Sequence, residues 1–323
     1  MIGALFLTWL AMREKLDLID VHSPYPYGPM AILPAWLLGT KVVATCHGEE
    51  LAMTEHTPMG RRILEWFLRS AHRCGSSNSH VASEVAEICG RFPRIIPYNT
   101  AASGRLATGK GRRNPQASAT LLFNGHLSQR KGLLYLIKAL PLVLKKRNVR
   151  LLITGTGECR AEWERLVSEL QLGEAVTFLG HLSGSELGQL YQTCDIFVLP
   201  AVFDEPADTE GLGLVLVEAL INGRPVIATP VGGIVEVIKH KRTGLLVPER
   251  SETALARAIL RLLEDRLLAR QLGRAGRDFA EKHFDGERIT GELEKFFYET
   301  LEGAPPAKPQ VRGSHALASQ GAF

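Results

Sequence analysis

The sequence has no hydrophobic run long enough to cross a membrane and no cysteine spacing typical of a metal site. Its apolar start, residues 2–12, is shorter than the ~20 residues that span a bilayer and has no basic stretch before it. We therefore expect a buried helix there, with 13–15 as its solvated end, rather than an anchor or a signal segment. The five cysteines are odd in number and widely spread, which indicates reduced packing residues in a cytoplasmic protein.

The sequence also carries little net charge. Lys and Arg number 38 and Asp and Glu 34, so the excess of +4 is too small to indicate a nucleic-acid partner. Hydrophobic residues at 45 % and charged residues at 22 % are ordinary for a globular protein and exclude a disordered or collagen-like chain. Because 323 residues exceed what one compact core usually holds, we expect two domains.

Short β-branched runs alternate with helical segments over the first hundred residues. This alternation predicts an α/β fold with a parallel sheet that helices cover on both faces. We assign residues 1–101 to this first Rossmann-like domain. The expected strands are 16–21, 41–46, 73–76 and 94–97, and the expected helices are 30–38, 61–71 and one that Ser79 caps.

A stretch rich in small, basic and helix-breaking residues, 102–118, predicts an interdomain linker. A second alternation fills 119–285 and is complete enough for a doubly wound domain. Residues 286–301 predict an amphipathic helix that returns to the first domain, and the Pro-, Gly- and Ala-rich tail 302–323 is expected to be disordered. The expected strands of the second domain are 120–123, 150–154, 175–179, 195–199, 225–229 and 244–247. Two such domains form a cleft at the carboxyl ends of their strands, where ligands of these folds bind.

The segment EGLGLVLVE, residues 210–218, follows one of these strands and a polar loop. If a helix begins near Leu212, its free amides and the positive end of its dipole favour an anion such as a diphosphate. Glu210 then flanks the anion, and Glu218 lies ~12 Å further along the helix and ~80° around its axis. Two carboxylates so placed can bracket a nucleotide sugar. The alternative is that both are solvated charges near a helix end.

Three further loops follow predicted strands at the same edge. FNGHLSQRKG (123–132) places Lys131 where its ammonium could neutralise phosphate charge, while Arg130 is expected to point elsewhere. The alternative is ordinary surface charge, although cations at a helix start favour an anionic partner. The loops TGTGE (154–158) and VGGIVE (231–236) bring backbone close to the cleft, but a lone Gly-x-Gly is most often only a tight turn.

In this order and spacing, these segments resemble a known family. NGHLSQRKG, LLITGTGE, CDIFVLPA, EGLGLVLVEAL and GRPVIATPVGGIVEVI look like the C-terminal domain of the large retaining glycosyltransferase family with the GT-B fold (glycosyltransferase family 4, glycosyl transferases group 1). DLIDVHS, KVVATCHGEEL and SSNSHVASEVAE resemble the later part of its N-terminal, acceptor-binding domain. The resemblance spans residues 16–301. It implies metal-independent transfer of a hexose from a UDP- or GDP-sugar to a glycan or glycolipid acceptor, without a cofactor and with retained anomeric configuration.

The resemblance also implies a role for each matching residue. Lys131 binds the diphosphate, Glu210 holds the donor hexose, and Glu218 holds the ribose. His47, in the HGEE motif of the other domain, approaches the hexose and the reacting centre. No metal ligand and no enzymatic nucleophile is implied, because the leaving phosphate helps to take the acceptor's proton. The other implied substrate-binding residues, which cradle the diphosphate or line the base, are Gly211, Leu212, Gly213, Leu214, Gly125, Gly155, Gly157, Leu179, Gly180 and Gly233.

The sequence departs from the family pattern at residue 126. Where the family carries a diphosphate-binding Arg in a Gly-Arg-Leu triplet, this chain has His126. Arg is always charged, whereas a histidine with the reference pKa of ~6.5 is mostly neutral at pH 7. We count His126 among the catalytic residues, on the hypothesis that the bound donor keeps it protonated and that turnover declines as the pH rises above neutral.

The family also begins with a strand, a glycine-rich loop and two further βα units that have no match here. We therefore expect an N-terminally truncated first domain, with 16–21 as an open apolar sheet edge. Two other functions stay open: a GT-B-fold epimerase acting on a UDP-sugar, and a catalytically impaired nucleotide-sugar-binding subunit. Peripheral contact with the inner face of a membrane through Arg61, Arg62 and Arg69 is a further hypothesis, to which a solvated helix face is the alternative.

Overall fold

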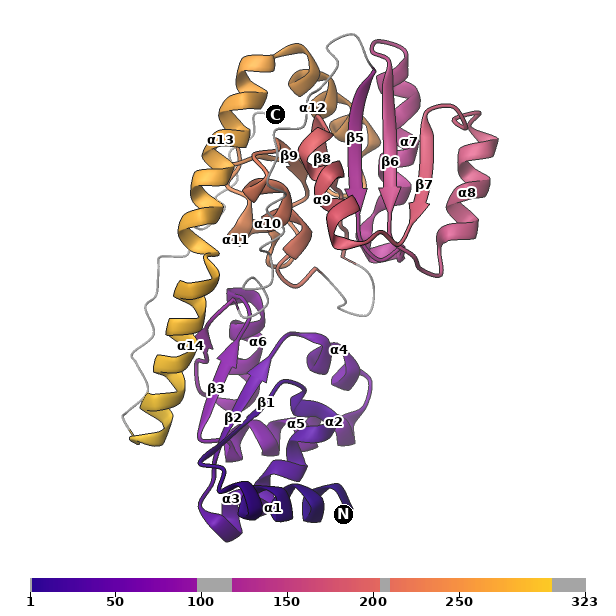
Figure 1. Ribbon diagram of the computed structural model, residues 1–323. Coiled ribbons are helices and arrows are strands. Elements are labelled where there is room, and N and C mark those ends of the chain that lie inside the picture. Colours follow the sequence, from indigo (N-terminus) through magenta and orange to yellow (C-terminus); the bar gives the residue numbers. More distant parts are fainter. Residues whose placement is uncertain (1, 98–117, 204–209, 304–323) are drawn as a thin grey trace.

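The computed structural model describes residues 2–97, 118–203 and 210–303 of the chain. Within them the chain forms two parallel sheets, each with its own hydrophobic core and its own helices (Figure 1). Two long helices, α13 (Arg266–His283) and α14 (Gly286–Leu301), follow one another along one side of the molecule. The fold is therefore α/β with two Rossmann-like halves, as the sequence predicts.

The first sheet contains four parallel strands in the order β1-β2-β3-β4. β1 lies at one edge of this sheet, as expected, and is half-buried along its length, whereas the interior strand β2 is fully buried after its first residue. The strands are β1 (Leu18–Val21), β2 (Lys41–Cys46), β3 (Arg73–Ser76) and β4 (Arg94–Ile95). The helices are α1 (Ile2–Glu14), α2 (Pro24–Tyr27), η1 (Gly28–Ala31), α3 (Ile32–Leu38), α4 (Glu49–Glu55), α5 (Pro58–Ser70) and α6 (Ser79–Cys89). The sequence prediction misses α4.

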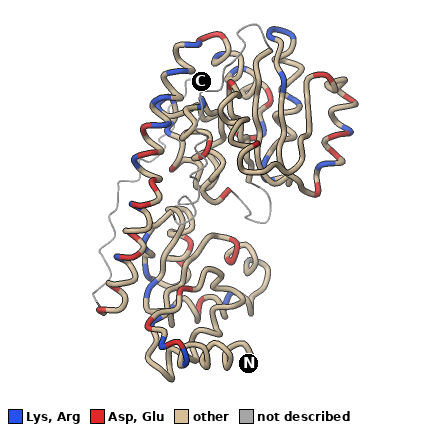
Figure 2. The backbone as a smooth tube through the Cα atoms, viewed as in Figure 1, with Lys and Arg blue, Asp and Glu red and all other residues tan. Residues whose placement is uncertain are grey.

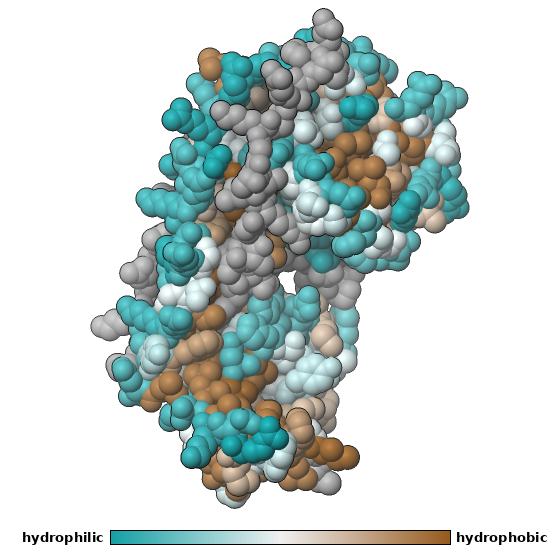
Figure 3. All heavy atoms as spheres, in the orientation of Figure 1, coloured by the Kyte–Doolittle hydropathy of each residue, from teal (hydrophilic) through white to brown (hydrophobic). Residues whose placement is uncertain are grey.

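The helix α1 forms, but the prediction that it is buried is wrong. Only Thr8 and Ala11 are buried, where α1 packs against α3 and η1. Large apolar side chains face outward, and Phe6 and Trp9 keep 60 % and 47 % of their surface exposed. Figure 3 shows apolar surface at this end of the molecule. A helix that is apolar all round gives no sequence signal for its inward face. No helix in the described part of the chain is both long and apolar enough to cross a membrane.

The start of α6 differs from the expectation by one residue. Asn78, not Ser79, is the N-cap, because its side-chain oxygen accepts a hydrogen bond from the backbone N–H of Val81 at 2.9 Å. Ser79 therefore occupies the first helical position, and its hydroxyl is available for a contact outside the helix.

The second sheet has six parallel strands in the order β10-β9-β8-β5-β6-β7. Every strand predicted in this half is present, with ends that differ by one residue. The strands are β5 (Ala119–Asn124), β6 (Val149–Thr154), β7 (Val176–Gly180), β8 (Ile196–Leu199), β9 (Val226–Ala228) and β10 (Leu245–Leu246). The helices are η3 (Gln129–Lys131), α7 (Leu133–Leu144), α8 (Arg160–Glu169), α9 (Gly184–Thr193), α10 (Leu214–Ile221), α11 (Ile234–Val237) and α12 (Glu252–Glu264). The sequence prediction misses α13.

The last helix, α14, lies against the first sheet although it follows the second half in sequence. Ile289 and Phe296 are buried together with Val43 of β2. At the far end of α14, the carboxylate of Glu299 accepts a hydrogen bond from Arg94 at 2.8 Å. The first half is therefore built from residues 2–97 together with α14, which comes much later in the sequence. The predicted linker, apart from residue 118, and the predicted tail from 304 onward lie outside the described residues.

Candidate active site

Two loops meet where the strand order of the second sheet reverses. The chain proceeds from β5 to β6 and β7 on one side, and β8 then lies on the other side of β5. In doubly wound sheets, the loops that diverge at such a point form the ligand site. The loop after β5 carries Lys131, and the loop after β8 carries Glu210. The two side chains form an ion pair, and each is only 9 % exposed.

Arg130 also reaches Glu210, so the prediction that its side chain points elsewhere is wrong. Its Nη1 lies 3.2 Å from Oε2 of Glu210, the same oxygen that Lys131 contacts. The backbone N–H of Val202 donates to the carbonyl of Arg130 at 2.8 Å, which ties the two loops together. Within the described residues, Oε1 of Glu210 receives no hydrogen bond. Two cations around one carboxylate leave a local positive charge, which suits an anionic ligand.

The helix α10 begins at Leu214, two residues later than expected. Its N-cap is Gly213, whose φ of 72° places it in the left-handed region that favours glycine. Glu210 therefore lies in the loop before the helix, and the predicted axial separation of Glu210 and Glu218 along one helix is wrong. A Cβ on Gly213 would lie 3.7 Å from Cγ of Glu210, so the carboxylate side chain lies beside the residue that caps the helix, whose first N–H groups have no partner within the helix.

Glu218 lies on α10 and belongs to a hydrogen-bonded chain that the sequence did not reveal. The hydroxyl of Tyr191 donates to Oε2 of Glu218 at 2.8 Å and accepts from the amide of Asn124 at 3.0 Å. The amide oxygen of Asn124 in turn accepts from the hydroxyl of Thr154 at 2.7 Å. Burial, and then the charge of Glu218, raise the pKa of Tyr191 well above its ordinary value, so the phenol remains a donor. The carboxylate orientation is thus fixed from the ends of β5 and β6.

The glycine-rich loops pack closely enough to exclude side chains. A Cβ on Gly155 would lie 1.9 Å from the carbonyl oxygen of Gly125, and a Cβ on Gly233 would lie 1.9 Å from that of Gly211. Both distances are far inside contact distance, so these positions require glycine. Backbone hydrogen bonds join the same loops, including Gly125 N–H to Thr154 O at 3.2 Å and Gly233 N–H to Glu210 O at 3.1 Å.

The remaining predicted loop residues extend this surface. The N–H of Gly155 donates to the carbonyl of Gly180 at 2.8 Å, which places the end of β7 beside the loop after β6. Leu179 is partly exposed there. Gly157 packs against the backbone of Leu127, two residues after Gly125. Leu212 is buried. The loops after β5, β6 and β7, the segment before α10 and the loop before α11 therefore form one continuous edge.

His126 lies in the loop after β5 but does not touch the buried ion pair. Its Nε2 lies 2.9 Å from Oε2 of Glu158, and both side chains are exposed. A hydrogen bond to its own backbone, and then the contact with His126, lower the pKa of Glu158. The structure thus gives His126 an acidic neighbour that the sequence analysis did not consider.

The first half faces this edge with His47, which follows β2. A Cβ on Gly211 would lie 3.8 Å from the carbonyl oxygen of His47, so the two loops approach each other. The amide of Asn78 donates to the carbonyl of Gly211 at 3.1 Å. The backbone N–H and the hydroxyl of Ser79 both donate to Oε1 of Glu236, each at 2.6 Å. These contacts bring the predicted residues of both halves to one cleft.

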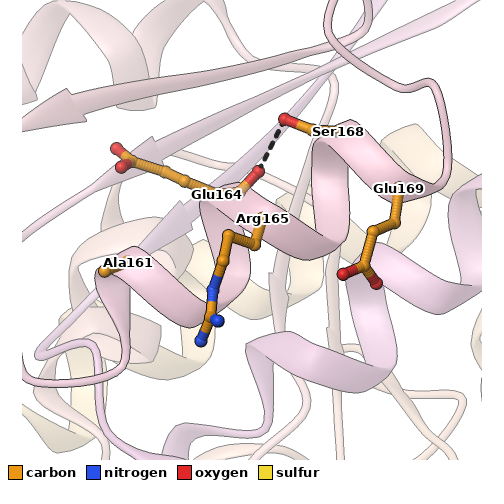
Figure 4. Close-up of a pocket in the computed structure, with 5 residues that line it drawn as sticks. All are labelled: Ala161, Glu164, Arg165, Ser168 and Glu169. Atoms are coloured by element: carbon orange, nitrogen blue, oxygen red, sulfur yellow. Dashed lines mark hydrogen bonds between the residues drawn. The ribbon is translucent and has the colours of Figure 1, made fainter.

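Two other features of the surface hold none of the predicted site residues. The helix α13 carries mainly basic side chains, with five Lys or Arg against two Asp or Glu, and α14 carries more acidic than basic ones (Figure 2). Figure 4 shows a surface pocket whose lining comes from the single helix α8. It holds none of the predicted site residues. The lining residues are Ala161, Glu164, Arg165, Ser168 and Glu169.

Two Rossmann-like halves that meet at the carboxyl ends of their strands define the GT-B class of fold. Solved structures support this class. HepE of Anabaena in complex with UDP matches 92 % of this chain and 82 % of its own, with 19 % identity and a TM-score of 0.77. A sucrose-phosphate synthase of Thermosynechococcus elongatus matches 93 % and 78 %, with 23 % identity and a TM-score of 0.77.

Family models cover both halves. The model of glycosyl transferases group 1 matches residues 110–279, and that of glycosyltransferase family 4 matches residues 2–97. The chain therefore belongs to the glycosyl transferases group 1 family. A GDP-mannose-dependent monoacylated alpha-(1-6)-phosphatidylinositol monomannoside mannosyltransferase of Corynebacterium glutamicum is 34 % identical over 88 % of this chain and 78 % of its own. An uncharacterised glycosyltransferase of Methanocaldococcus jannaschii is 37 % identical over a matched region of 145 residues. This region covers 45 % of this chain and 36 % of that protein.

Proposed function

We propose that this chain is a retaining, metal-independent hexosyltransferase that uses a nucleoside diphosphate sugar as donor. The observation that carries the proposal is the convergence of Lys131, Arg130, Glu210 and the start of α10 at the switch point of the second sheet. Two cations and the amides of a helix start favour a diphosphate. Membership of the family supplies the reaction class, which is glycosyl transfer.

Each group at this point has a chemical task in the proposal. The bond from the sugar C1 to the diphosphate oxygen breaks, and the charge that develops on the leaving oxygen is stabilised by Lys131 and the first amides of α10. The acceptor oxygen attacks C1 from the same face, and its proton passes to the leaving diphosphate. Glu210 accepts a hydroxyl hydrogen bond from the hexose through Oε1, and His47 approaches the hexose from the other half.

The nucleoside end of the donor fits the Glu218 side of the edge. A carboxylate held by Tyr191 at one oxygen can accept hydrogen bonds from the two ribose hydroxyls. The glycine-rich edge formed by the loops at Gly155 and Gly180 lines the base through backbone groups. The nucleotide is UDP or GDP, with uracil or guanine as the base: the Corynebacterium relative is described as GDP-mannose-dependent, and HepE was solved with UDP.

The acceptor in this proposal is a glycan or a lipid-linked sugar that meets the first half. The Corynebacterium relative acts on a phosphatidylinositol mannoside, which is a glycolipid. We also propose peripheral contact with an acidic membrane surface through α5, where Arg62 and Arg69 are exposed beside Trp66. Arg69 is paired with Glu65 at 2.8 Å, so Arg62 supplies the larger part of this attraction. Co-sedimentation with vesicles that contain phosphatidylglycerol tests it, and R62Q should reduce binding.

Glu210→Gln tests the assignment of the site. We expect transfer from the donor to fall by about 10²–10³-fold, because the hexose loses its charged acceptor and the cation cluster loses its carboxylate. Donor hydrolysis should fall in parallel. The matched control is Glu174→Gln, at an exposed glutamate between α8 and β7. Wild-type transfer by E210Q would show that this carboxylate does not hold the donor.

Product analysis separates the proposal from the two alternative functions. Mass spectrometry and NMR of the product should show a glycoside with retained configuration only when an acceptor is present. An isomerised donor without acceptor would indicate an epimerase, and donor binding without any product would indicate a binding subunit. Undiminished transfer in excess EDTA is expected for a metal-independent enzyme.

A further inference from the structure

His47 itself belongs to a second group of titratable side chains, in the first half of the molecule. Its partners there are His22 and Asp20. β1 ends at Val21 and β2 ends at Cys46, and the parallel register pairs Val21 with Ala44. The residues that follow the two strands are both histidines. Nδ1 of His22 lies 3.0 Å from Nε2 of His47, and the rings are nearly parallel, with centroids 5.3 Å apart and an interplanar angle of 19°.

The other nitrogen of His22 is fixed by a carboxylate. Nε2 of His22 lies 2.9 Å from Oδ2 of Asp20. The remaining oxygen of Asp20 accepts a hydrogen bond from the buried hydroxyl of Thr45 on the neighbouring strand, at 2.5 Å. Because a carboxylate only accepts hydrogen bonds, Nε2 of His22 carries a proton. The donor and the acceptor are thus defined for the hydrogen bonds from Thr45 to Asp20 and from His22 to Asp20. Only the hydrogen bond between His22 and His47 can run in either direction.

Neighbouring charges and burial distinguish the two imidazoles. The hydrogen bond with Asp20 raises the pKa of His22, against the opposite effect of its burial. Burial, and then the charge on His22, lower the pKa of His47, while Glu49 on α4 and Asp20 act in the opposite direction more weakly. Since two imidazolium rings at this distance repel each other, one proton taken up by the pair resides on His22. His22 then donates from Nδ1 to Nε2 of His47.

We propose that Asp20 and His22 are positioning residues for His47: through the contact from Nδ1 of His22 to Nε2 of His47, they fix the ring orientation of His47 and the nitrogen that carries its proton. This inference rests on the proposed role of His47 beside the donor hexose. It gives a role to Asp20 and His22 at the end of β1, and the sequence motifs assign no role to either residue. When His22 is charged, Nε2 of His47 accepts and its proton resides on Nδ1. When the pair loses one proton, the proton between the rings resides on Nε2 of His47, Nδ1 of His47 no longer carries one, and the tautomer is reversed.

The test is a comparison of His22→Ala and His22→Asn in the full chain. An asparagine amide can donate from about the position of the imidazole Nδ1, so His22→Asn should keep His47 oriented and His22→Ala should not. The ¹⁵N shifts of the His47 ring, recorded from pH 5.5 to 8.5 without donor, report which nitrogen is protonated. In the wild type we expect a change of tautomer when His22 titrates. His22→Ala should abolish that change, and Asp20→Asn should move it to lower pH.

Kinetics supply the second readout. A catalytic group displaced by about 1 Å can cost about 10²-fold, so we expect kcat of His22→Ala to fall between about tenfold and 10²-fold with a smaller change in donor KM. His22→Asn should recover part of kcat. The control is His80→Ala, at a histidine on α6 whose contact with Glu84 is long, at 3.7 Å. Unfolding temperatures verify that each variant is folded.

Two results would overturn the inference. One is an unchanged pH dependence of the His47 ¹⁵N shifts in His22→Ala, and the other is equal kcat for His22→Ala and His80→Ala. The shift measurement needs neither donor nor acceptor, so its outcome is independent of the proposed transfer reaction. A failure of the proposed function would instead appear as wild-type transfer by E210Q.

Discussion

The ammonium of Lys131 and the carboxylate of Glu210 form a buried ion pair that joins the loop after β5 to the loop after β8. Breaking a buried pair leaves one charge without its partner, which is costly even where the pair itself adds little stability. Here Arg130 shares the same carboxylate oxygen and offsets part of that cost. The pair therefore links the stability of the second half to its proposed binding of an anion.

Lys131→Met should lower both stability and turnover. Loss of one partner of a buried pair typically costs about 3–5 kcal/mol, and we expect the lower end because Arg130 remains. Loss of the cation beside the leaving diphosphate should reduce kcat by about 10²–10³-fold. Urea unfolding and steady-state kinetics measure the two effects. The matched control is Lys138→Met, at an exposed lysine on α7.

The double variant K131M/E210Q separates the two effects. It removes both charges, so it should recover a part of the stability that Lys131→Met loses but none of the activity. A Lys131→Met protein as stable and as active as Lys138→Met would contradict the assignment of this pair to the site.

Tyr191→Phe should weaken donor binding without exposing new surface. The substitution removes the hydroxyl that donates to Glu218 and accepts from Asn124, so the carboxylate loses its fixed orientation. A hydrogen bond to a charged group contributes about 1.5–3 kcal/mol, which corresponds to a roughly 10–150-fold weaker Kd. Calorimetry with UDP and GDP measures it, and the better binder also identifies the base.

The control for this experiment is Tyr298→Phe, at an exposed tyrosine on α14. Because Tyr191→Phe acts on the ribose side, the free nucleoside diphosphate should show the same loss as the complete donor. If inorganic pyrophosphate binding fell to the same extent, the effect would be a general loss of structure rather than a loss of ribose contacts.

The sequence predicted the strands of the second half well because buried parallel strands read as short apolar runs, and β6 and β8 differ from their expected bounds by one residue. It predicted the meeting of Lys131 and Glu210 because loops after such strands share an edge. It did not predict the direction of Arg130, since a side chain's direction depends on the partner that a distant loop supplies. Nor did it reveal Tyr191, which resembles any core aromatic until its hydroxyl is seen beside Glu218.

The burial of α1 and the contact of His22 with His47 could not be predicted from the sequence either, because both depend on how distant segments pack. Periodicity predicts a helix but cannot predict its environment when every face is apolar, and α1 is in fact buried only at Thr8 and Ala11. The strand end at His22 was visible in the sequence. Its contact with His47 depends on the register of β1 against β2, which a single sequence does not give.

His126→Arg should strengthen the binding of the donor diphosphate by about tenfold. A guanidinium is charged at every working pH and offers a planar fork of N–H donors that matches a phosphate, whereas an imidazole has only two ring nitrogens. Because Nε2 of His126 lies 2.9 Å from Oε2 of Glu158, Glu158→Gln is the companion variant, which removes the competing carboxylate. Calorimetry with UDP and GDP measures the Kd, and equal values for the wild type and His126→Arg would exclude His126 from donor binding.

Ser79 and Glu236 join the two halves across the cleft, and this contact should keep the two halves close together. The carboxylate of Glu236 accepts from both the backbone N–H and the hydroxyl of Ser79. Ser79→Ala removes the hydroxyl bond and leaves the backbone bond, so we expect a loss of about 1–2 kcal/mol of the interdomain contact and about a tenfold rise in donor KM. Ser83→Ala, on the exposed side of the same helix, is the control. Small-angle scattering should show a larger radius of gyration for Ser79→Ala than for Ser83→Ala, and equal radii with equal KM would mean that the bridge does not set the distance between the halves.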